Sequence, residues 1–149
     1  MTDLKTTAGK IEDLDAKLAE SRAPLGEGEP AARTRVTQLL DEGSFVETDA
    51  LARHRSTDFG REHDRPYTDG VVTGYGRISG RPVCIYAHDK TVYGGSVGVT
   101  FGKKVTEVMD MAIKIGCPVI GIQDSGGARI QDAVTSLAMY SEIARRQLP

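Results

Sequence analysis

The feature that most constrains the fold is an order of elements that occurs twice in the second half of the sequence. A strand candidate at residues 82–88 (PVCIYAH) leads into a loop with adjacent glycines at 91–98 (TVYGGSVG), and a helix candidate follows from Phe101 to Ile115. Apolar residues at 105, 108, 109 and 112 give this helix one inward face, and Gly116 is a typical C-terminal cap.

The second unit begins directly after that helix. A short apolar run, Val119 to Gln123, has the composition of a strand buried on both faces. Asp124 to Ala128 (DSGGA) is a second loop with adjacent glycines, and a last helix is predicted over residues 129–146. Strands that alternate with helices indicate an α/β fold.

A β-hairpin is predicted just before the first unit. Val71 to Ile78 is a strand candidate, and Ser79-Gly80-Arg81 supplies the turn into the strand 82–88. The sheet of the α/β fold is therefore expected to begin with an antiparallel pair.

The first half of the sequence is mainly helical. Amphipathic patterns predict helices from Thr7 to Ser21 and from Ala31 to Asp41, with a linker rich in Pro and Gly between them and Gly43 ending the second. A short strand is expected at 44–47, followed by a long polar loop at 51–68. We therefore divide the chain into a helical segment, 1–43, and an α/β domain, 44–149.

Composition excludes several classes of function. With 19 Lys and Arg against 21 Asp and Glu, the chain lacks the basic excess of a nucleic-acid-binding protein. No apolar stretch is long enough for a membrane span, and no signal peptide opens the sequence, so we expect a cytoplasmic protein. Cys84 and Cys117 lie in apolar surroundings and are expected to be buried reduced thiols. The three histidines show no metal-ligand spacing, so no metal site is predicted.

Two glycine pairs, each before a helix, suggest a site for negative charge. Glycine lets a ligand approach the backbone, and a helix start presents unpaired N–H groups. The charge could belong to a phosphate or to an oxyanion that forms during a reaction, or the glycines could serve only tight turns. Neither G-x-G-x-x-G nor G-x-x-x-x-G-K-[ST] occurs, and Ser125 is not in a G-x-S-x-G elbow.

Three stretches resemble the carboxyltransferase β subunits of propionyl-CoA and related biotin-dependent acyl-CoA carboxylases. They are Leu39 to Gly60, Asp69 to Gly98 (DGVVTGYGRISGRPVCIYAHDKTVYGGSVG) and Pro118 to Val134 (PVIGIQDSGGARIQDAV). The DSGGARIQ string is the most specific of these. The resemblance implies a crotonase-like fold, a spiral of ββα units, here incomplete.

The resemblance also implies a reaction and its site. Members of the family transfer CO₂ from carboxybiotin, held on a separate biotin carrier protein, to the α carbon of a short-chain acyl-CoA such as propionyl-CoA or acetyl-CoA. Backbone N–H groups stabilise the developing oxyanions, and no metal is needed. Position by position, the catalytic amides are those of Gly126, Gly127 and Ala128. The implied substrate-binding residues are Gly94, Gly95, Ser125, Arg129, Arg33 and Arg35.

Two alternatives stay open for Arg129, which is expected in the first turn of the last helix. An arginine is poorly placed at a helix N-terminus, which suggests a ligand or a structural carboxylate as its partner. The other alternative is a surface salt bridge.

The sequence departs from the family in two places. The family's basic segment before the LLD residues is shortened here, with only Arg33 and Arg35 remaining. The family sequence also continues into a further glycine loop and a second crotonase-like half. We therefore expect a chain that is inactive alone and works with the remaining carboxyltransferase halves, a biotin carboxylase and carrier subunit, and further copies of the complete subunit. The alternative is a non-catalytic truncated relative that binds acyl-CoA or a carboxylase partner.

Overall fold

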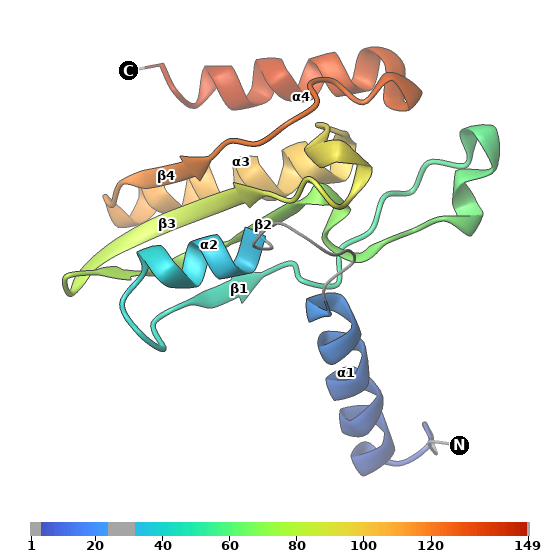
Figure 1. The fold of residues 1–149 in the computed structure, drawn as a ribbon, viewed down its shortest axis with the longest axis horizontal. Coiled ribbons are helices and arrows are strands. Elements are labelled where there is room, and N and C mark those ends of the chain that lie inside the picture. Colours follow the sequence, from blue (N-terminus) through green and yellow to red (C-terminus); the bar gives the residue numbers. More distant parts are fainter. Residues whose placement is uncertain (1–3, 24–31, 149) are drawn as a thin grey trace.

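A four-stranded mixed sheet forms the centre of the computed structural model, which describes residues 4–23 and 32–148 (Figure 1). The strands lie in the order β1, β2, β3, β4; the first three are antiparallel neighbours, and the fourth is parallel to the third. Their bounds are Val46–Thr48, Val71–Ile78, Arg81–His88 and Val119–Ile122. The sheet with its helices confirms the predicted α/β fold.

The helices form layers on the two faces of this sheet. Helix α2 (Ala32–Leu39) covers one face, α3 (Val99–Ile115) covers the other, and α4 (Ala133–Arg145) packs against α3 (Figure 1). The α2 face buries one cluster: Ala32, Val36, Leu40, Val72, Val83, Ile85 and Ala87. The α3 face buries a second: Val71, Tyr86, Val97, Phe101, Val105 and Met109.

The hairpin between β2 and β3 turns at Ser79 and Gly80, two of the three predicted turn residues, whereas Arg81 already belongs to β3. Ser79 and Gly80 have φ angles of 50° and 76°, which suit the two central residues of a type I′ turn. The Asp41 carboxylate accepts both of their N–H groups at 2.8 Å, and the N–H of Asp41 donates to the carbonyl of Arg77 at 2.8 Å. Helix α2 therefore ends at Leu39, earlier than the predicted Asp41, because Asp41 joins the hairpin.

Helix α3 agrees with its sequence pattern. Its residues at 105, 108, 109 and 112 are buried, and Gly116 caps it in the left-handed conformation with its N–H on the carbonyl of Ala112. Gly102 lets α4 approach closely, since a Cβ at this position would collide with the side chain of Met139. Arg146, just after α4, forms a two-pronged ion pair with Asp110 of α3.

Helix α1 (Thr7–Arg22) extends away from the sheet (Figure 1). Two residues of its predicted apolar stripe, Ile11 and Leu14, are 55% and 46% exposed. The linker predicted after it lies outside the described residues. The division at Gly43 stays a prediction, although α2 contributes to the core of the sheet. In the described ranges, no helix has the length and apolar character to cross a membrane.

The second unit differs from its prediction in two ways. Strand β4 is only half-buried, whereas the sequence suggested burial on both faces. Helix α4 begins at Ala133, not Arg129, because Arg129 is extended and its N–H bonds the carbonyl of Val97. The apolar stripe of this helix and the turn before it is exposed: Ile130, Val134, Leu137 and Tyr140.

A buried ion pair joins segments that are 60 residues apart. The side chains of Arg129 and Asp69 are 1% and 0% exposed, and their charged atoms lie 2.5 Å apart. The guanidinium also donates to the carbonyls of Asp69 and Ser96, at 3.0 and 2.8 Å. The second carboxylate oxygen of Asp69 accepts the N–H of Phe101 in the first turn of α3. One pair thus holds the start of α3, the first glycine loop and the second glycine loop.

Cys84 and Cys117 are free thiols that lie next to each other, with 3.7 Å between their sulfur atoms. Cys84 is fully buried and Cys117 is half-buried. Burial, with a smaller contribution from the neighbouring thiol, raises the pKa of Cys84 from 9.0 to about 12. Cys84 is therefore a protonated core residue at neutral pH.

We predict that Asp69→Asn lowers the free energy of unfolding by about 3–5 kcal/mol, because it leaves a buried guanidinium without its counter-charge. Urea unfolding followed by circular dichroism measures the change. The control is Asp110→Asn, which breaks a pair whose carboxylate side chain is 44% exposed and should cost less than about 1 kcal/mol. Equal losses for the two variants would contradict this role of Asp69.

For the thiols, we predict that Cys84→Ser lowers the free energy of unfolding by about 1–3 kcal/mol, since a hydroxyl is then buried in an apolar site. The wild-type contribution of Cys84 should be fully present below about pH 9 and should fall as pH rises toward 12, because the unfolded thiol ionises first. Urea unfolding of both proteins at pH 7 and pH 10 tests this. A difference that is larger at pH 10 would contradict it.

Candidate functional site

The two glycine loops lie side by side. The N–H of Gly126 donates to the carbonyl of Gly94 at 2.8 Å, and the N–H of Val97 donates to the carbonyl of Gly127 at 2.9 Å. Val97 and Ala128 thereby form a parallel β-bridge outside the main sheet. The structure brings together five of the predicted site residues in this way: Gly94, Gly95, Gly126, Gly127 and Ala128.

Two glycines in the loops are required for different reasons. Gly95 has a φ of 66°, and a Cβ there would collide with the carbonyl oxygen of Asp124. Gly127 has a φ of 100°, but no atom lies within 4 Å of the place where its Cβ would be. Gly95 therefore serves the contact between the loops, whereas Gly127 keeps open space in front of the backbone.

Ser125 fixes the shape of the second loop. Its hydroxyl donates to the carbonyl of Gly95 at 2.8 Å and accepts the N–H of Gly127 at 3.0 Å. The hydroxyl is therefore engaged with the backbone on both sides, which is a structural use.

The three N–H groups predicted as oxyanion donors are not equivalent. That of Gly126 is bonded to Gly94, and that of Gly127 is bonded to Ser125. Among the described residues, the N–H of Ala128 has no hydrogen-bond partner. Ala128 is thus the member of the predicted trio that has a donor free for a ligand.

Arg129 differs from its prediction in position and in partner. It precedes α4, and its guanidinium is enclosed with the carboxylate of Asp69, the backbone of Ser96 and the ring of Tyr93. The predicted alternative of a surface salt bridge for Arg129 is therefore wrong. Its partner is a structural carboxylate, that of Asp69. Arg129 therefore holds the loop rather than facing a ligand.

The two arginines of α2 have different surroundings. Arg33 is bonded through two nitrogens to the carboxylate of Glu47, at 2.9 and 2.8 Å. Arg35 reaches Asp124, the first residue of the second loop, at 3.1 Å and keeps a quarter of its side chain exposed. Of the two, Arg35 is the arginine that lies at the glycine loops.

Lys90 adds a second positive charge at Asp124, at 3.4 Å. The hydrogen bond from Arg35, with a smaller contribution from Lys90, holds the pKa of the Asp124 carboxyl below its ordinary value. Two cations thus converge on one carboxylate beside the loops, and an anionic group of a ligand would find positive charge there.

A cavity of about 270 Å³ lies between the second loop and α4. Its walls are mainly apolar, and six side chains bring polar atoms to it: Tyr86, His88, Gln123, Ser125, Tyr140 and Gln147. A larger cavity of about 910 Å³ lies under residues 49–58, at the first turns of α3 and α4, and is lined by charged side chains of both signs. None of the predicted site residues lines the larger cavity, so the smaller one belongs to the candidate site.

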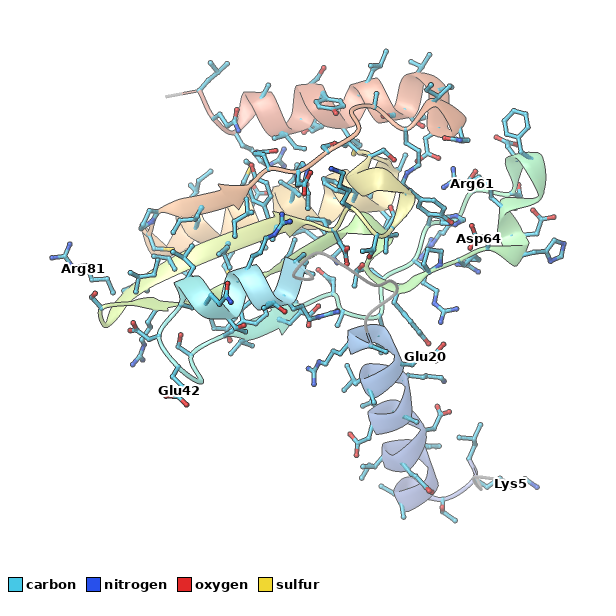
Figure 2. The ribbon with its side chains drawn as sticks, in the orientation of Figure 1. Lys5, Glu20, Glu42, Arg61, Asp64 and Arg81 are labelled. Atoms are coloured by element: carbon cyan, nitrogen blue, oxygen red, sulfur yellow. The ribbon has the colours of Figure 1, made fainter. Side chains whose placement is uncertain are left out.

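The long loop at 51–68 is tied to the same region. Arg61 pairs with Asp132, just before α4, at 2.6 Å, and the hydroxyl of Tyr93 donates to the carbonyl of Asp64 at 2.6 Å (Figure 2). These contacts fix the predicted long polar loop against the first glycine loop and the start of α4.

The sequence did not predict roles for Asp69, Ser96 and His88 at the site. Asp69 and His88 flank buried strands, where a charged or titratable residue next to an apolar run is a usable signal. Ser96 carried no such signal, because its role depends on a partner 33 residues away.

Comparison with known proteins assigns a family. Residues 24–148 match the model of the carboxyl transferase domain. The chain is 54% identical to the propionyl-CoA carboxylase beta chain of Saccharopolyspora erythraea, over 97% of this chain and 28% of that protein. It is 52% identical to the biotin-dependent acetyl-/propionyl-coenzyme A carboxylase beta5 subunit of Mycobacterium tuberculosis, over 98% of this chain and 28% of that subunit.

Solved structures agree with this family. The transcarboxylase 12S structure with methylmalonyl-coenzyme A bound superposes with a TM-score of 0.90 at 41% identity, over 95% of this chain and 29% of that one. A Pseudomonas malonate decarboxylase hetero-tetramer superposes with a TM-score of 0.68 at 31% identity, over 78% of this chain and 45% of that one. The chain spans about 28% of the length of the curated relatives that it matches. With its crotonase-like fold and a family match over most of its length, the chain belongs to the carboxyl transferase domain family.

Proposed function

We propose that this chain forms one wall of the acyl-CoA site of a biotin-dependent acyl-CoA carboxylase, in its carboxyltransferase component. The observation that carries the proposal is the pair of glycine loops in which the N–H of Ala128 has no hydrogen-bond partner among the described residues, beside the positive charges of Arg35 and Lys90. An acyl-CoA needs both features, because its phosphates are anionic and its thioester carbonyl gains negative charge when the α proton leaves.

The residues have separate tasks in this proposal. Ala128 donates its N–H to the acyl-CoA, and Gly127 leaves the backbone open to it. Ser125 and Gly95 hold the two loops at a fixed spacing, and Arg129 holds the second loop from behind. Preorganised donors of this kind lower a barrier without reorganisation during the reaction.

The acyl group in the proposal is short. Two relatives are named for acetyl-CoA or propionyl-CoA, whereas a third, 49% identical, is named as a long chain acyl-coenzyme A carboxylase subunit. The cavity beside Ser125 and Gly127 has a volume of about 270 Å³ and is lined mainly by apolar atoms. A volume of this size supports an acyl group of a few carbons.

Carboxybiotin on a separate carrier protein is the proposed co-substrate. Relatives of this chain are named biotin-dependent. The exposed apolar stripe of α4 supports a further partner, the remaining segments of a carboxyltransferase. Transfer of CO₂ then takes place in a site that this chain completes only together with those segments.

We predict that Gly127→Val weakens binding of propionyl-CoA by about tenfold or more, because the side chain fills the space before the loop. The matched control is Gly80→Val at the hairpin turn, which also has a positive φ and open space around it. Both variants should lose about 1–3 kcal/mol of stability from backbone strain. Isothermal titration calorimetry and thermal unfolding measure the two effects. Equal affinities for the two variants would remove the loop from the site.

A second prediction tests the charge. Arg35→Gln should weaken binding of propionyl-CoA by about tenfold or more, since hydrogen bonds to charged groups contribute about 1.5–3 kcal/mol. Arg81→Gln, an exposed arginine at the hairpin end, is the control with the same change of charge (Figure 2). The effect should shrink in high salt. If the two variants bind propionyl-CoA equally well, Arg35 does not contact the substrate, and the proposed function loses its anion site.

A further inference from the structure

His88 is a buried histidine to which the proposed site gives no task. It ends β3, directly before the first glycine loop, and is 5% exposed. Its ring meets the ring of Phe101 edge-on, with 4.9 Å between the ring centres. Among the described residues, neither ring nitrogen has a hydrogen-bond partner, and Nδ1 is closed off from solvent.

A buried imidazole without a hydrogen-bond partner is unusual. Buried polar atoms in proteins are nearly always paired, and each exception calls for an explanation. Burial lowers the pKa of His88, and the charge of Asp124 only partly opposes this, so the imidazole is neutral at neutral pH. A neutral imidazole has one N–H to donate and one nitrogen to accept.

A ligand in the cavity beside the second glycine loop could supply the missing hydrogen-bond partner of His88. His88 lines it together with Ser125 and Gly127 of that loop. Most of the remaining wall is apolar, with Phe101, Val105 and Ile143 among its side chains, and Tyr140 and Gln147 bring polar atoms from α4 and the residues after it. Tyr86 and Gln123 also line it, but Gln123 already donates to the hydroxyl of Tyr86 at 2.8 Å. His88 is thus the buried wall residue that has no hydrogen-bond partner among the described residues, whereas Tyr140 and Gln147, which also line the cavity, are exposed to solvent.

We propose that His88 is a specificity-determining residue that hydrogen-bonds a small, uncharged, carbonyl-bearing group lodged in this cavity. The apolar walls exclude a charged group, the volume excludes a nucleotide, and a carbonyl oxygen is the acceptor that an imidazole N–H lacks. This inference rests on the proposed function, which supplies two sources of that chemistry: the acyl thioester of acyl-CoA and the ureido group of biotin.

The experiment observes His88 directly. The chain has three histidines, so the ring signal of His88 in a proton–carbon NMR spectrum can be assigned from its loss in His88→Gln. Propionyl-CoA, coenzyme A without an acyl group and biotin methyl ester are added separately. A shift of the His88 signal with propionyl-CoA but not with coenzyme A supports the acyl source. A shift with biotin methyl ester supports the ureido source.

Variants separate ligand contact from packing. His88→Leu should weaken the probe that shifts the signal by about tenfold and should keep or raise the melting temperature, because the unpaired nitrogens are removed. His88→Gln retains a donor and should stay within about threefold of wild type. The control, His63→Gln, changes an exposed histidine of the 51–68 loop and should alter neither quantity.

The remaining outcomes distinguish this inference from the proposed function. If propionyl-CoA binds by calorimetry while the His88 signal does not move with any probe, the inference is wrong and the proposed function stands. If His88→Leu binds like wild type, or melts several degrees lower with unchanged affinity, His88 is a packing residue and the inference is wrong. If neither propionyl-CoA nor biotin methyl ester binds, both proposals fall.

Discussion

The ion pair between Arg129 and Asp69 is the interaction on which the rest of the site depends. It is fully buried, so neither charge can be lost or solvated without a large cost. Through it, the start of α3, the carbonyl of Ser96 and the second glycine loop share one set of hydrogen bonds. The free N–H of Ala128 lies one residue from this pair, and its direction is therefore fixed by a charge that never meets the ligand.

Some residues of the two glycine loops hold the loops together, and others leave the backbone accessible to a ligand. Gly95 and Ser125 bring the two loops together, and the N–H groups of Gly126 and Gly127 are used in doing so. Of the three predicted donors, Gly126, Gly127 and Ala128, the N–H of Ala128 is therefore the one that remains for a ligand. A glycine-rich motif can therefore be mostly structural and still present one reactive backbone group.

The sequence was informative where the determinants are local. The hairpin turn at Ser79 and Gly80, the cap at Gly116 and the inward face of α3 depend on neighbours in the chain, and all three were predicted correctly. The start of α4 and the partner of Arg129 were not, because an acidic residue 60 positions away decides both. The free N–H of Ala128 was equally hidden, since hydrogen-bond occupancy follows from how the loops meet.

The hydrogen bonds from the hairpin turn to the Asp41 carboxylate determine where this chain can be shortened. Asp41 and α2 belong to the segment before Gly43, but they close the β2–β3 turn and cover Val72, Val83 and Ile85. A shortened protein that starts after Gly43 would expose two β-branched strands along one apolar face. Such surfaces pair with one another in solution. Helix α2 and Asp41 thus belong to the same structural unit as the sheet whose apolar face and hairpin turn they cover.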